Sequence, residues 1–519
     1  MTGQPTRRSV LRGGIVVGAG VAGASLGAAR PAAAALVRRG RPAFTHGIQS
    51  GDVGARDGIV WARADRPARM IVEVSGRPDL RGARRVRGPI LTPDTDLTGK
   101  TWVRDLEPGR DVYYRVVLAD LADPSLTSAP LAGTFRTAPV RRAGVRFVWS
   151  GDLAGQGYGI NPDFGGFVAF DAIRALRPDF YLHNGDTIYA DDPIEATVTT
   201  PDGRTWRNLV TEGKSVVAQS LDGYRENYRY NLLDEPLRRF AAEIAQVNQW
   251  DDHEVHNNWY PGEILEDPNY TEKRVDVLRV YAARAFHEYV PIEPFRSDPD
   301  RVYRKRSYGP SLDLFALDMR AYRDPNGPDD YTVPTGGIFG RRQVEWLKRE
   351  LLASRATWKV ISNDMPLGLV VPDGPRIEAV AQGRPGAPLG RELDLADILS
   401  FIRRHRIRNV VWLTTDVHYT AAIRYSPDTP GAGFQDFDPF WEFVSGPIHA
   451  GSFGPNKLDT TFGPRVVWQK TPPYANASPF DGYQFFGEAA IEGDTGVLTV
   501  NLRDLHGSVL WTIDLDPEG

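Results

Sequence analysis

A short apolar run, residues 180–182, leads into the sequence His183-Asn184-Gly185-Asp186-Thr187-Ile188-Tyr189-Ala190-Asp191-Asp192. The apolar run predicts a buried strand, and Gly185 lets the backbone turn where that strand ends. In open α/β sheets, ligands bind at such strand ends. Three carboxylates and the phenol of Tyr189 crowd into seven residues, and such groups repel one another unless water or a cation compensates them. The stretch is therefore either a solvated acidic loop or part of a cation site.

The residues before this stretch complete a strand–helix–strand unit. Residues 145–150 predict a strand that ends at Gly151-Asp152, and residues 167–176 have helical spacing. This order of elements is typical of an α/β domain. Asp152 and Asp186 would then follow neighbouring strands at the same edge of a sheet, where ligands bind.

Three later apolar runs also end in side chains that can bind metals, namely Asp252 with His253, Asn363, and Asp416 with His418. An aspartate at a strand end is often only a helix cap or a turn former. A single histidine such as His418 is often an ordinary polar side chain. Five such strand ends in one α/β domain are much less expected by accident, so together they favour a shared site.

The N-terminal part has a different pattern. Residues 41–138 contain short strands separated by turns, including Leu106-Glu107-Pro108-Gly109, which predicts a β-sandwich of immunoglobulin or fibronectin type III style. We expect a second domain over residues 143–519, in which residues of about 190–250 form a largely helical cap over the site. A chain of 519 residues is long enough for two domains.

The first 35 residues have the features of a twin-arginine export signal. Arg7 and Arg8 precede a run rich in Gly and Ala, and small residues follow at 32–35. A membrane anchor is the alternative, although the run is only weakly apolar and no later stretch approaches the ~20 apolar residues that span a bilayer. We expect residues 1–35 to engage the twin-arginine machinery and to be removed. The mature chain would have no transmembrane segment and would be secreted, periplasmic or on the cell surface.

Composition excludes some classes of protein. The formal net charge is −4, and a mildly acidic chain is a poor candidate for non-specific nucleic-acid binding. There are no cysteines, so the protein has neither disulfides nor thiolate ligands. A metal site would have to use Asp, Glu, His, Asn and Tyr.

The motifs resemble those of calcineurin-like metallophosphoesterases, and in particular the alkaline phosphatase D (PhoD-like) family. The resemblance rests on Gly-Asp at 151–152, Gly-Asp-x-x-Tyr at 185–189, Asp-Asp-His-Glu at 251–254 and Asp-x-His at 416–418, with the signal and residues 44–63. It implies an α/β (α+β) fold, a four-layer metallophosphoesterase β-sandwich flanked by helices, after the N-terminal sandwich. Tyr189 is similar to the tyrosine with which purple acid phosphatases bind ferric iron.

The resemblance also implies a two-metal site. By motif position, its ligands would be Asp152, a bridging Asp186, Tyr189, Asp252, Asn363 (matched by strand position alone), Asp416 and His418. His253 takes the place of the catalytic histidine. His183, Asn184, His256 and Asn257 either orient the ligands or make ordinary structural hydrogen bonds. Relatives often have a cysteine in the turn at Ser150–Asp152, where this chain has none.

The donor atoms suggest which metals would bind. The set Asp152, Asp186, Tyr189 and His418 contains a phenolate, a hard anion that favours Fe³⁺. The set Asp186, Asp252, Asn363 and Asp416 is all oxygen, which suits Ca²⁺ or Mn²⁺ better than Zn²⁺. A metal-bound hydroxide would be the nucleophile, and His253 would stabilise the transition state or protonate the leaving oxygen.

We therefore expect a secreted, metal-dependent hydrolase of phosphoric esters, similar to alkaline phosphatase D. The alternative on the same scaffold is a phosphodiesterase or a phospholipase D-like enzyme. A non-catalytic surface protein that binds calcium or phosphate is a third possibility. A pure calcium site would need neither Tyr189 nor His253.

Overall fold

The computed structural model describes residues 40–295, 297–327 and 337–518. The export signal predicted for residues 1–35 lies outside these residues. Within the described ranges, no helix combines the length and the apolar character needed to cross a membrane.

Two large sheets carry most of the strands. Over the described residues, the first sheet has nine strands in the spatial order β24 (Val509–Leu515), β23 (Leu498–Asp504), β22 (Phe485–Ile491), β8 (Val145–Ser150), β9 (Phe180–His183), β12 (Gln246–Asn248), β1 (Phe44–Gly51), β2 (Gly58–Ala64) and β5 (Thr98–Val103). Its strands β8, β9 and β12 are parallel, with Leu182 paired to Trp149 on one side and to Val247 on the other. The strand–helix–strand unit predicted around residue 170 is thus confirmed.

The second large sheet packs against the first through a shared core. In the part of the chain that the structure describes, it has seven strands in the order β13 (Arg304–Tyr308), β14 (Leu312–Ala316), β15 (Trp358–Ser362), β18 (Val410–Thr414), β20 (Phe440–Val444), β19 (Thr420–Tyr425) and β21 (Pro464–Lys470). Strands β14, β15, β18 and β20 are parallel. Their carboxyl ends therefore share one edge of the sheet.

The alternation of side chains along each strand builds the layers. In β8, Phe147 and Trp149 enter the core between the two sheets, whereas Val148 enters the core beneath the helices. In β15, Val360 faces the first sheet and Ile361 faces helices on the other side. The central strands β9, β14 and β15 are buried on both faces, which explains why they are continuous apolar runs.

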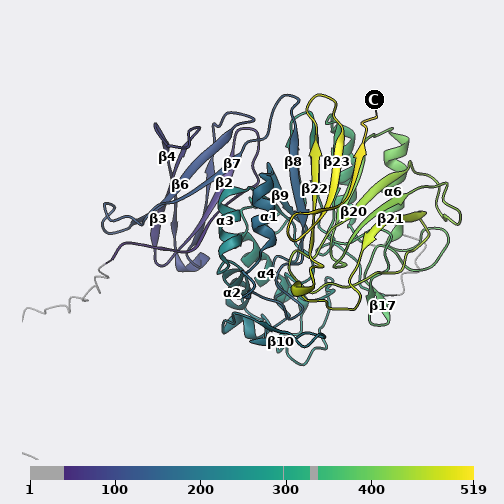
Figure 1. Ribbon diagram of the computed structural model, residues 1–519, viewed down its shortest axis with the longest axis horizontal. Helices are drawn as coiled ribbons and strands as arrows, with labels where there is room; N and C mark the ends of the chain where they lie inside the picture. Colours follow the sequence, from purple (N-terminus) through teal and green to yellow (C-terminus); the bar gives the residue numbers. More distant parts are fainter. Residues whose placement is uncertain (1–39, 296, 328–336, 519) are drawn as a thin grey trace, which may run out of the picture. The chain divides into compact units, whose positions relative to one another are not determined.

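Helices cover the outer faces of both sheets. They are α1 (Ala169–Leu176), α2 (Leu221–Asn231), α3 (Glu235–Glu243), α4 (Val275–Tyr289), α5 (Arg341–Ala353) and α6 (Glu392–Arg404). Side chains of α1 to α4 share a core with the first sheet, and side chains of α5 and α6 share one with the second. Figure 1 shows α1 and α3 beside β9, and α6 beyond β20. The expected four-layer α/β architecture is confirmed.

The N-terminal residues form a sandwich whose two sheets differ in extent. One is a separate sheet of β4 (Arg84–Leu91), β3 (Ala68–Ser75), β6 (Asp111–Asp120) and β7 (Leu131–Arg136), and the other consists of β1, β2 and β5. Met70 and Val116 of the separate sheet pack with Val60 of β2. Strand β1 also pairs in parallel with β12, through Gly51 and Gln246. Residues Arg41–Gly519 form one compact unit, and the separate domain predicted for residues 41–138 stays a prediction.

Most of the segment of about residues 190–250, expected to form a cap over the site, does not line the site. Its first part is a hairpin of β10 (Thr197–Thr199) and β11 (Thr205–Arg207), not a helix. Helices α2 and α3 belong to the outer helical layer because Tyr228 and Phe240 are buried there with α1 and α4. Of the described residues, those that line the cleft at the site fall outside residues 193–250. The structure therefore places this segment beside the first sheet instead of over the site.

Candidate metal centre

The predicted ligands meet where the carboxyl ends of the two large sheets come together. Asp152 follows β8, Asp186 follows β9 and Asp252 follows β12, all in the first sheet. Asn363 follows β15 and Asp416 follows β18, in the second sheet. Side chains from five separate stretches of sequence thus converge at one sheet edge, as ligand sites in open α/β sheets do.

Buried amides join the two sheets at this edge. The Nδ2 of Asn184 donates to Ser362 Oγ at 3.0 Å and to the carbonyl oxygens of Asn363 and Leu413 at 2.9 and 3.3 Å. Gln249 donates to the carbonyl oxygen of Ser362 at 2.9 Å. These bonds set the spacing between strand ends of different sheets, so Asn184 contributes to the geometry of the centre without facing it.

The backbone is unusual at the same strand ends. Asp152, Asp186, Asp416 and His418 have φ of 62°, 52°, 66° and 59°. Residues other than glycine seldom adopt this left-handed conformation, and it accumulates at functional sites. Gly185 has φ of 124°, and a Cβ there would lie 2.4 Å from the Cβ of Asp251. The glycine is therefore needed both for the turn and for the close approach of the loop that follows β12.

The carboxylates and histidines form linked groups. Among the described residues, three sets have potential ligand atoms within 4.8 Å of one another: Asp152, Asp186 and His418; Asp186, Asp252 and His253; and Asp251, Asp252 and Asp416. Asp186 belongs to the first two sets. The hydroxyl of Tyr189 lies 3.0 Å from His418 Nε2, which places it with the first set.

Several of these oxygens have no hydrogen-bond partner among the described residues. The buried atoms Asp152 Oδ1, Asp252 Oδ1, Asn363 Oδ1 and Asp416 Oδ2 make no hydrogen bond with the described residues. Burying an unpaired carboxylate is costly, and buried charges are normally paired or coordinate metals. Carboxylate, amide and phenol oxygens with one imidazole make a donor set that fits hard cations. The residues present therefore fit a metal centre.

The pKa values of the buried carboxylates also fit a metal centre. Burial raises the pKa of Asp186 well above its usual value, and repulsion from Asp252 and Asp251 raises it further. Burial also raises the pKa of Asp152 to about 8, although Thr415 opposes this shift by donating a hydrogen bond at 2.6 Å. A nearby cation reverses such shifts because it favours the ionised carboxylate.

His253 is paired with Asp191, a residue to which the sequence assigned no role. His253 Nδ1 lies 2.7 Å from Asp191 Oδ1, and the ring stacks on Tyr189 with centroids 4.2 Å apart. Burial lowers the pKa of His253, but Asp191 and Asp252 outweigh it and raise the pKa to about 10. The Gly-Asp-x-x-Tyr-x-Asp spacing was the available signal, since it puts a second carboxylate two residues after the tyrosine.

Two more residues that the sequence did not single out hold the loops of the centre. Glu254 accepts hydrogen bonds from the backbone amides of Asp186 at 3.0 Å and Thr187 at 2.8 Å, which ties the loop after β12 to the loop after β9. Lys214, from the inserted segment, donates to the carbonyl oxygens of Tyr189 and Asp192 at 2.5 and 2.9 Å. Both anchor the segment that carries Asp186, Tyr189 and Asp191.

The remaining candidates lie at different distances from the ligands. His183 is buried behind the strand end, where its Nδ1 accepts from the amide of Gly185 at 3.4 Å. The His256 side chain bonds the carbonyl oxygen of Asn257 at 2.9 Å and packs against Tyr270, and the backbone amide of His256 donates to the carbonyl oxygen of Asp252 at 2.8 Å. The amide of Asn257 donates to Asp191 Oδ2 at 2.6 Å, so Asn257 supports the Asp191–His253 pair.

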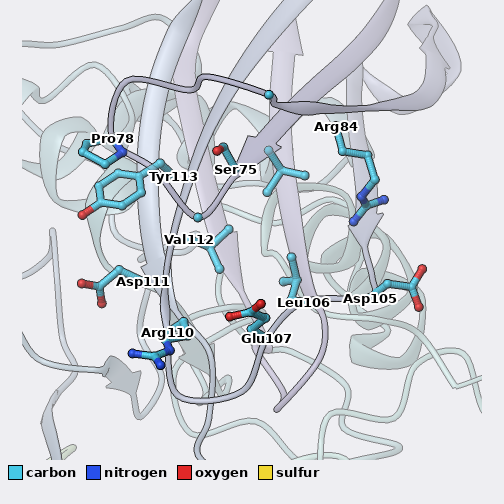
Figure 2. A pocket seen from close by; sticks show the side chains of 13 residues that line it. Ser75, Pro78, Arg84, Asp105, Leu106, Glu107, Arg110, Asp111, Val112 and Tyr113 are labelled. Atoms are coloured by element: carbon cyan, nitrogen blue, oxygen red, sulfur yellow. The ribbon is translucent and has the colours of Figure 1, made fainter.

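A cleft of about 420 Å³ opens onto the centre. Asp186, Asp252, His253, Asp416 and His418 form its floor, and its walls are Gln156, Asn257, Asn258, Val371, Pro372, Asp373, Gly374, Glu378, Val417, Phe453 and Asn456. Another hollow, of about 650 Å³, lies on the N-terminal sandwich between the β3–β4 turn and the start of β6 (Figure 2). Its wall carries Arg84, Glu107, Arg110 and Tyr113 and none of the predicted site residues.

The four-layer fold with this centre at the sheet edge defines a protein of the metallophosphatase class. Residues 147–502 match the PhoD-like phosphatase family, and residues 30–139 match the N-terminal domain of PhoD-like phosphatases. The chain therefore belongs to the PhoD-like phosphatase family, and it is a hydrolase that acts on phosphoric esters. The family and the enzyme class predicted from the motifs are confirmed, and the non-catalytic alternative is excluded.

Individual relatives agree with this assignment. Alkaline phosphatase D of Bacillus subtilis (strain 168) is 27% identical over 443 residues, which cover 80% of this chain and 71% of that protein. The structure of PhoD superimposes with a TM-score of 0.69 at 20% identity, over 92% of this chain and 91% of that one. Purple acid phosphatase PPD1 of yellow lupin (Lupinus luteus) gives 0.58 at 14% identity, over 92% and 74%. These two structures share the fold.

Proposed function

We propose that this chain hydrolyses phosphoric esters at a centre of two cations bridged by Asp186. The observation that carries this proposal is the position of Asp186 in two adjoining groups of potential ligands. One cation would be held by Asp152, Asp186, Tyr189 and His418, and the other by Asp186, Asp252, Asn363 and Asp416. Unpaired buried oxygens on both sides of Asp186 support this division.

The two ligand sets differ in chemistry. The first contains a phenol and an imidazole and suits Fe³⁺, whereas the second is all oxygen and suits Ca²⁺, with Mn²⁺ or Zn²⁺ as alternatives. Cations bound there would lower the pKa of a water molecule toward 7 and offset the negative charge of the phosphoryl group during displacement. The protein itself holds the ligands in fixed directions through the strand-end backbone and Asn184.

His253 is suited to act on the leaving group. Asp191 engages its Nδ1, so Nε2, which lies 4.0 Å from Asp252 Oδ2, is the ring nitrogen that remains for a substrate in the cleft. An imidazolium held in this way donates a proton to the oxygen that departs from phosphorus. The stacking on Tyr189 and the bond to Asp191 fix the orientation of the imidazole ring, so the ring is already oriented for proton transfer before the substrate binds.

Metal analysis combined with turnover tests this function. The chain exported in folded form should contain two metal ions, release p-nitrophenol from its phosphate monoester or bis-ester, lose activity on chelation and regain it with calcium or manganese. A phenolate-to-iron absorption band should disappear in Tyr189→Phe. Full activity in protein stripped of metal would contradict the proposal, and an active protein that holds zinc without a visible band would contradict the iron assignment.

A diester substrate is a second candidate, favoured by the walls of the cleft. Among the described lining residues there is no lysine or arginine, while Asp373 adds a negative charge beside neutral amides and the apolar Val371 and Phe453. A diester carries one negative charge fewer than a monoester dianion and has a second organic group for the apolar wall. Comparing kcat/KM for the p-nitrophenyl monoester and bis-ester separates the two, and choline release from phosphatidylcholine tests a phospholipase D-like activity.

Export is also part of the proposal. The signal features at Arg7 and Arg8 predict that the mature chain begins after about residue 35 and acts outside the cytoplasm. N-terminal sequencing of the secreted protein checks the cleavage point. Replacing both Arg7 and Arg8 by lysine should retain the precursor inside the cell.

A further inference from the structure

Arg320 lies completely buried behind the second ligand set. It follows β14 in the turn Leu317-Asp318-Met319-Arg320, and its side chain has no exposed surface. The turn is rigid: Asp318 Oδ1 accepts from the amide of Arg320 at 3.0 Å, and Gln343 of α5 bonds the amide and the carbonyl of Asp318 at 2.9 and 2.7 Å. The guanidinium therefore enters the centre from a fixed point of the second sheet.

The guanidinium meets carboxylates on two sides. Through Nε and Nη1, it lies 2.5 Å from Asp251 Oδ1 and 3.6 Å from Asp364 Oδ2 and pairs with Glu378 Oε1. Through Nη2, it lies 3.8 Å from Asp252 Oδ1 and 3.7 Å from Asp416 Oδ1. Asp251, Asp252 and Asp416 are the third set of potential ligands, so that set already faces a positive charge supplied by the protein.

The other side of the centre has no such group. Within the described residues, the ion pair recorded for Asp152 is with His418, and none with lysine or arginine is recorded for Asp152 or Asp186. Arg320 thus distinguishes the two proposed cation positions. At one position the aspartates have no lysine or arginine partner among the described residues, and at the other they face a built-in cation.

We propose that Arg320 is a positioning residue that holds Asp252 and Asp416 ready for the second, divalent cation, an inference that rests on the two-cation function proposed above. Its charge is matched at closer range by Asp251 and Glu378 than by the two ligands, so its net repulsion of an incoming ion is small. Its planar fork, held by Asp251 and Glu378, directs Nη2 toward both ligand carboxylates at 3.7 to 3.8 Å, without a hydrogen bond, and so places a fixed positive charge beside them. Without it, Asp251 and Glu378 would be uncompensated beside Asp252 and would push the ligands apart.

This role predicts the sign of the effect of a substitution. A guanidinium that merely repelled the ion would, once removed, leave the divalent ion bound more tightly. A guanidinium that positions the ligands would, once removed, leave the ion bound more weakly. The two roles therefore predict opposite changes of the same dissociation constant.

The experiment measures metal content and divalent-ion binding in Arg320→Gln and Arg320→Lys. Chelated protein is titrated with Mn²⁺ and with Ca²⁺, followed by thermal unfolding and by elemental analysis after gel filtration. Arg320→Gln should keep the ion on the Tyr189 side and its absorption, while the dissociation constant of the divalent ion rises at least tenfold. Arg320→Lys keeps the charge but loses the fork, and should recover part of this loss.

Arg323→Gln is the matched control. The Arg323 side chain is also buried, donates to Asn326 Oδ1 at 2.7 Å and to the carbonyl oxygen of Glu378, and lies 3.9 Å from Glu378 Oε1. Within the described chain it forms no hydrogen bond or ion pair with Asp252 or Asp416. Its loss should lower the unfolding temperature and leave divalent binding within twofold of wild type. Equal weakening in both glutamine variants would show a general effect of losing a buried arginine and would overturn the proposal.

Other outcomes also decide the matter. Tighter or unchanged divalent binding in Arg320→Gln, or loss of both ions together, overturns the positioning role. Should Arg320→Gln not fold, Arg320→Lys decides, because a wild-type dissociation constant in that variant is incompatible with a fork that places the ligands. If the wild-type chain itself binds fewer than two ions, the two-cation function fails and this inference falls with it.

Discussion

Two regions of this protein place an aspartate after a glycine at the end of a strand, and they use it in opposite ways. At the junction of the N-terminal sandwich with the first sheet, Asp52 follows Gly51 at the end of β1. At the centre, Asp152 follows Gly151 and Asp186 follows Gly185. Asp52, Asp152 and Asp186 all have positive φ, of 46°, 62° and 52°. Locally the three are alike.

Their partners are not alike. Both oxygens of Asp52 are engaged by Arg304, at 2.8 to 3.1 Å, and Arg306 adds a further ion pair. Burial would raise the pKa of Asp52, but the two guanidinium groups outweigh it and hold the pKa below its usual value. Asp152 and Asp186 lack such partners, and their pKa values are raised. A glycine–aspartate pair at a strand end therefore does not by itself mark a cation site, because the protein neutralises Asp52 with its own arginines.

The largest expected effect is that of Asp186→Asn. The variant should lose both metal ions and at least ~1,000-fold in kcat, because Asp186 would serve both of the proposed cations, and each tenfold corresponds to about 1.4 kcal/mol. Elemental analysis and turnover of the bis-ester measure this. Asp163→Asn, on the exposed surface, serves as the control, and near wild-type activity of Asp186→Asn would refute the proposed centre.

Asp52→Asn should affect stability instead. Removing one partner of a buried ion pair costs about 3–5 kcal/mol, since Arg304 and Arg306 would remain buried without a counter-charge. Chemical denaturation should show this loss, while the metal content and the kcat of the folded fraction stay at wild-type values. Asp123→Asn, an exposed aspartate bonded to Ser125, should change the free energy of unfolding by less than about 0.5 kcal/mol. Loss of metal in Asp52→Asn would erase the distinction between the two regions.

Asp191→Asn should lower the rate while leaving the metals in place. His253 would lose the carboxylate that orients it, so kcat should fall about 100-fold, within the usual range for general acid–base catalysis. The hydrolysis rate should fall more for esters whose alcohol is a poor leaving group than for p-nitrophenyl esters, whose leaving group needs no proton. Asp192→Asn is the matched control. It should leave kcat near its wild-type value, because Asp192 Oδ2 accepts from the amide of Gln156 and it is Asp191 that bonds His253. Equal losses for good and poor leaving groups would argue against proton donation by His253.

The smallest expected effect is the pH dependence of stability that comes from Lys100, at the junction of the N-terminal sandwich with the first sheet. Lys100 donates to the carbonyl oxygen of Ile292 at 2.7 Å, and burial lowers its pKa to about 7, although Asp52 and Glu288 oppose the shift. Between pH 7 and the ordinary lysine pKa of 10.5, the unfolded chain binds a proton that the folded chain has released. Stability from this group therefore rises with pH, by up to about 1.4 kcal/mol per unit.

Lys100→Met should remove that rise. The difference in free energy of unfolding between wild type and variant, measured by denaturation of metal-free protein at pH 7, 8 and 9, should grow with pH in favour of the wild type. A difference that does not vary with pH would show that the Lys100 ammonium stays charged inside the fold.

The strand ends and their side chains were predictable because the information is local. Apolar runs such as 180–182 and 410–413 determine buried parallel strands, glycines determine where they turn, and parallel strands present their carboxyl ends at one edge. Asp152, Asp186 and Asp416 could therefore be assigned to one edge of the fold from the sequence. The same pattern singled out Tyr189 and His418 beside Asp186 and Asp416, and the family resemblance added their roles as metal ligands. The structure brings both side chains to that edge.

The partners of those side chains were not predictable in the same way. Asp191 bonds His253 from 62 residues away, Arg304 compensates Asp52 from 252 residues away, and Arg320 reaches Asp251 across 69. The helices of the insertion also turned out to cover the first sheet, because their apolar faces are buried there.

The sequence alone thus determined which residues stand at the strand ends, through periodicity, glycine and the chemistry of each side chain. Only the tertiary structure decided which of those aspartates the protein pairs with its own arginines, as it does Asp52, and which it leaves without such partners, as it does Asp152 and Asp186. The physical reason is that the charge state of a buried carboxylate depends on groups within a few ångströms in space, and local sequence does not encode those neighbours.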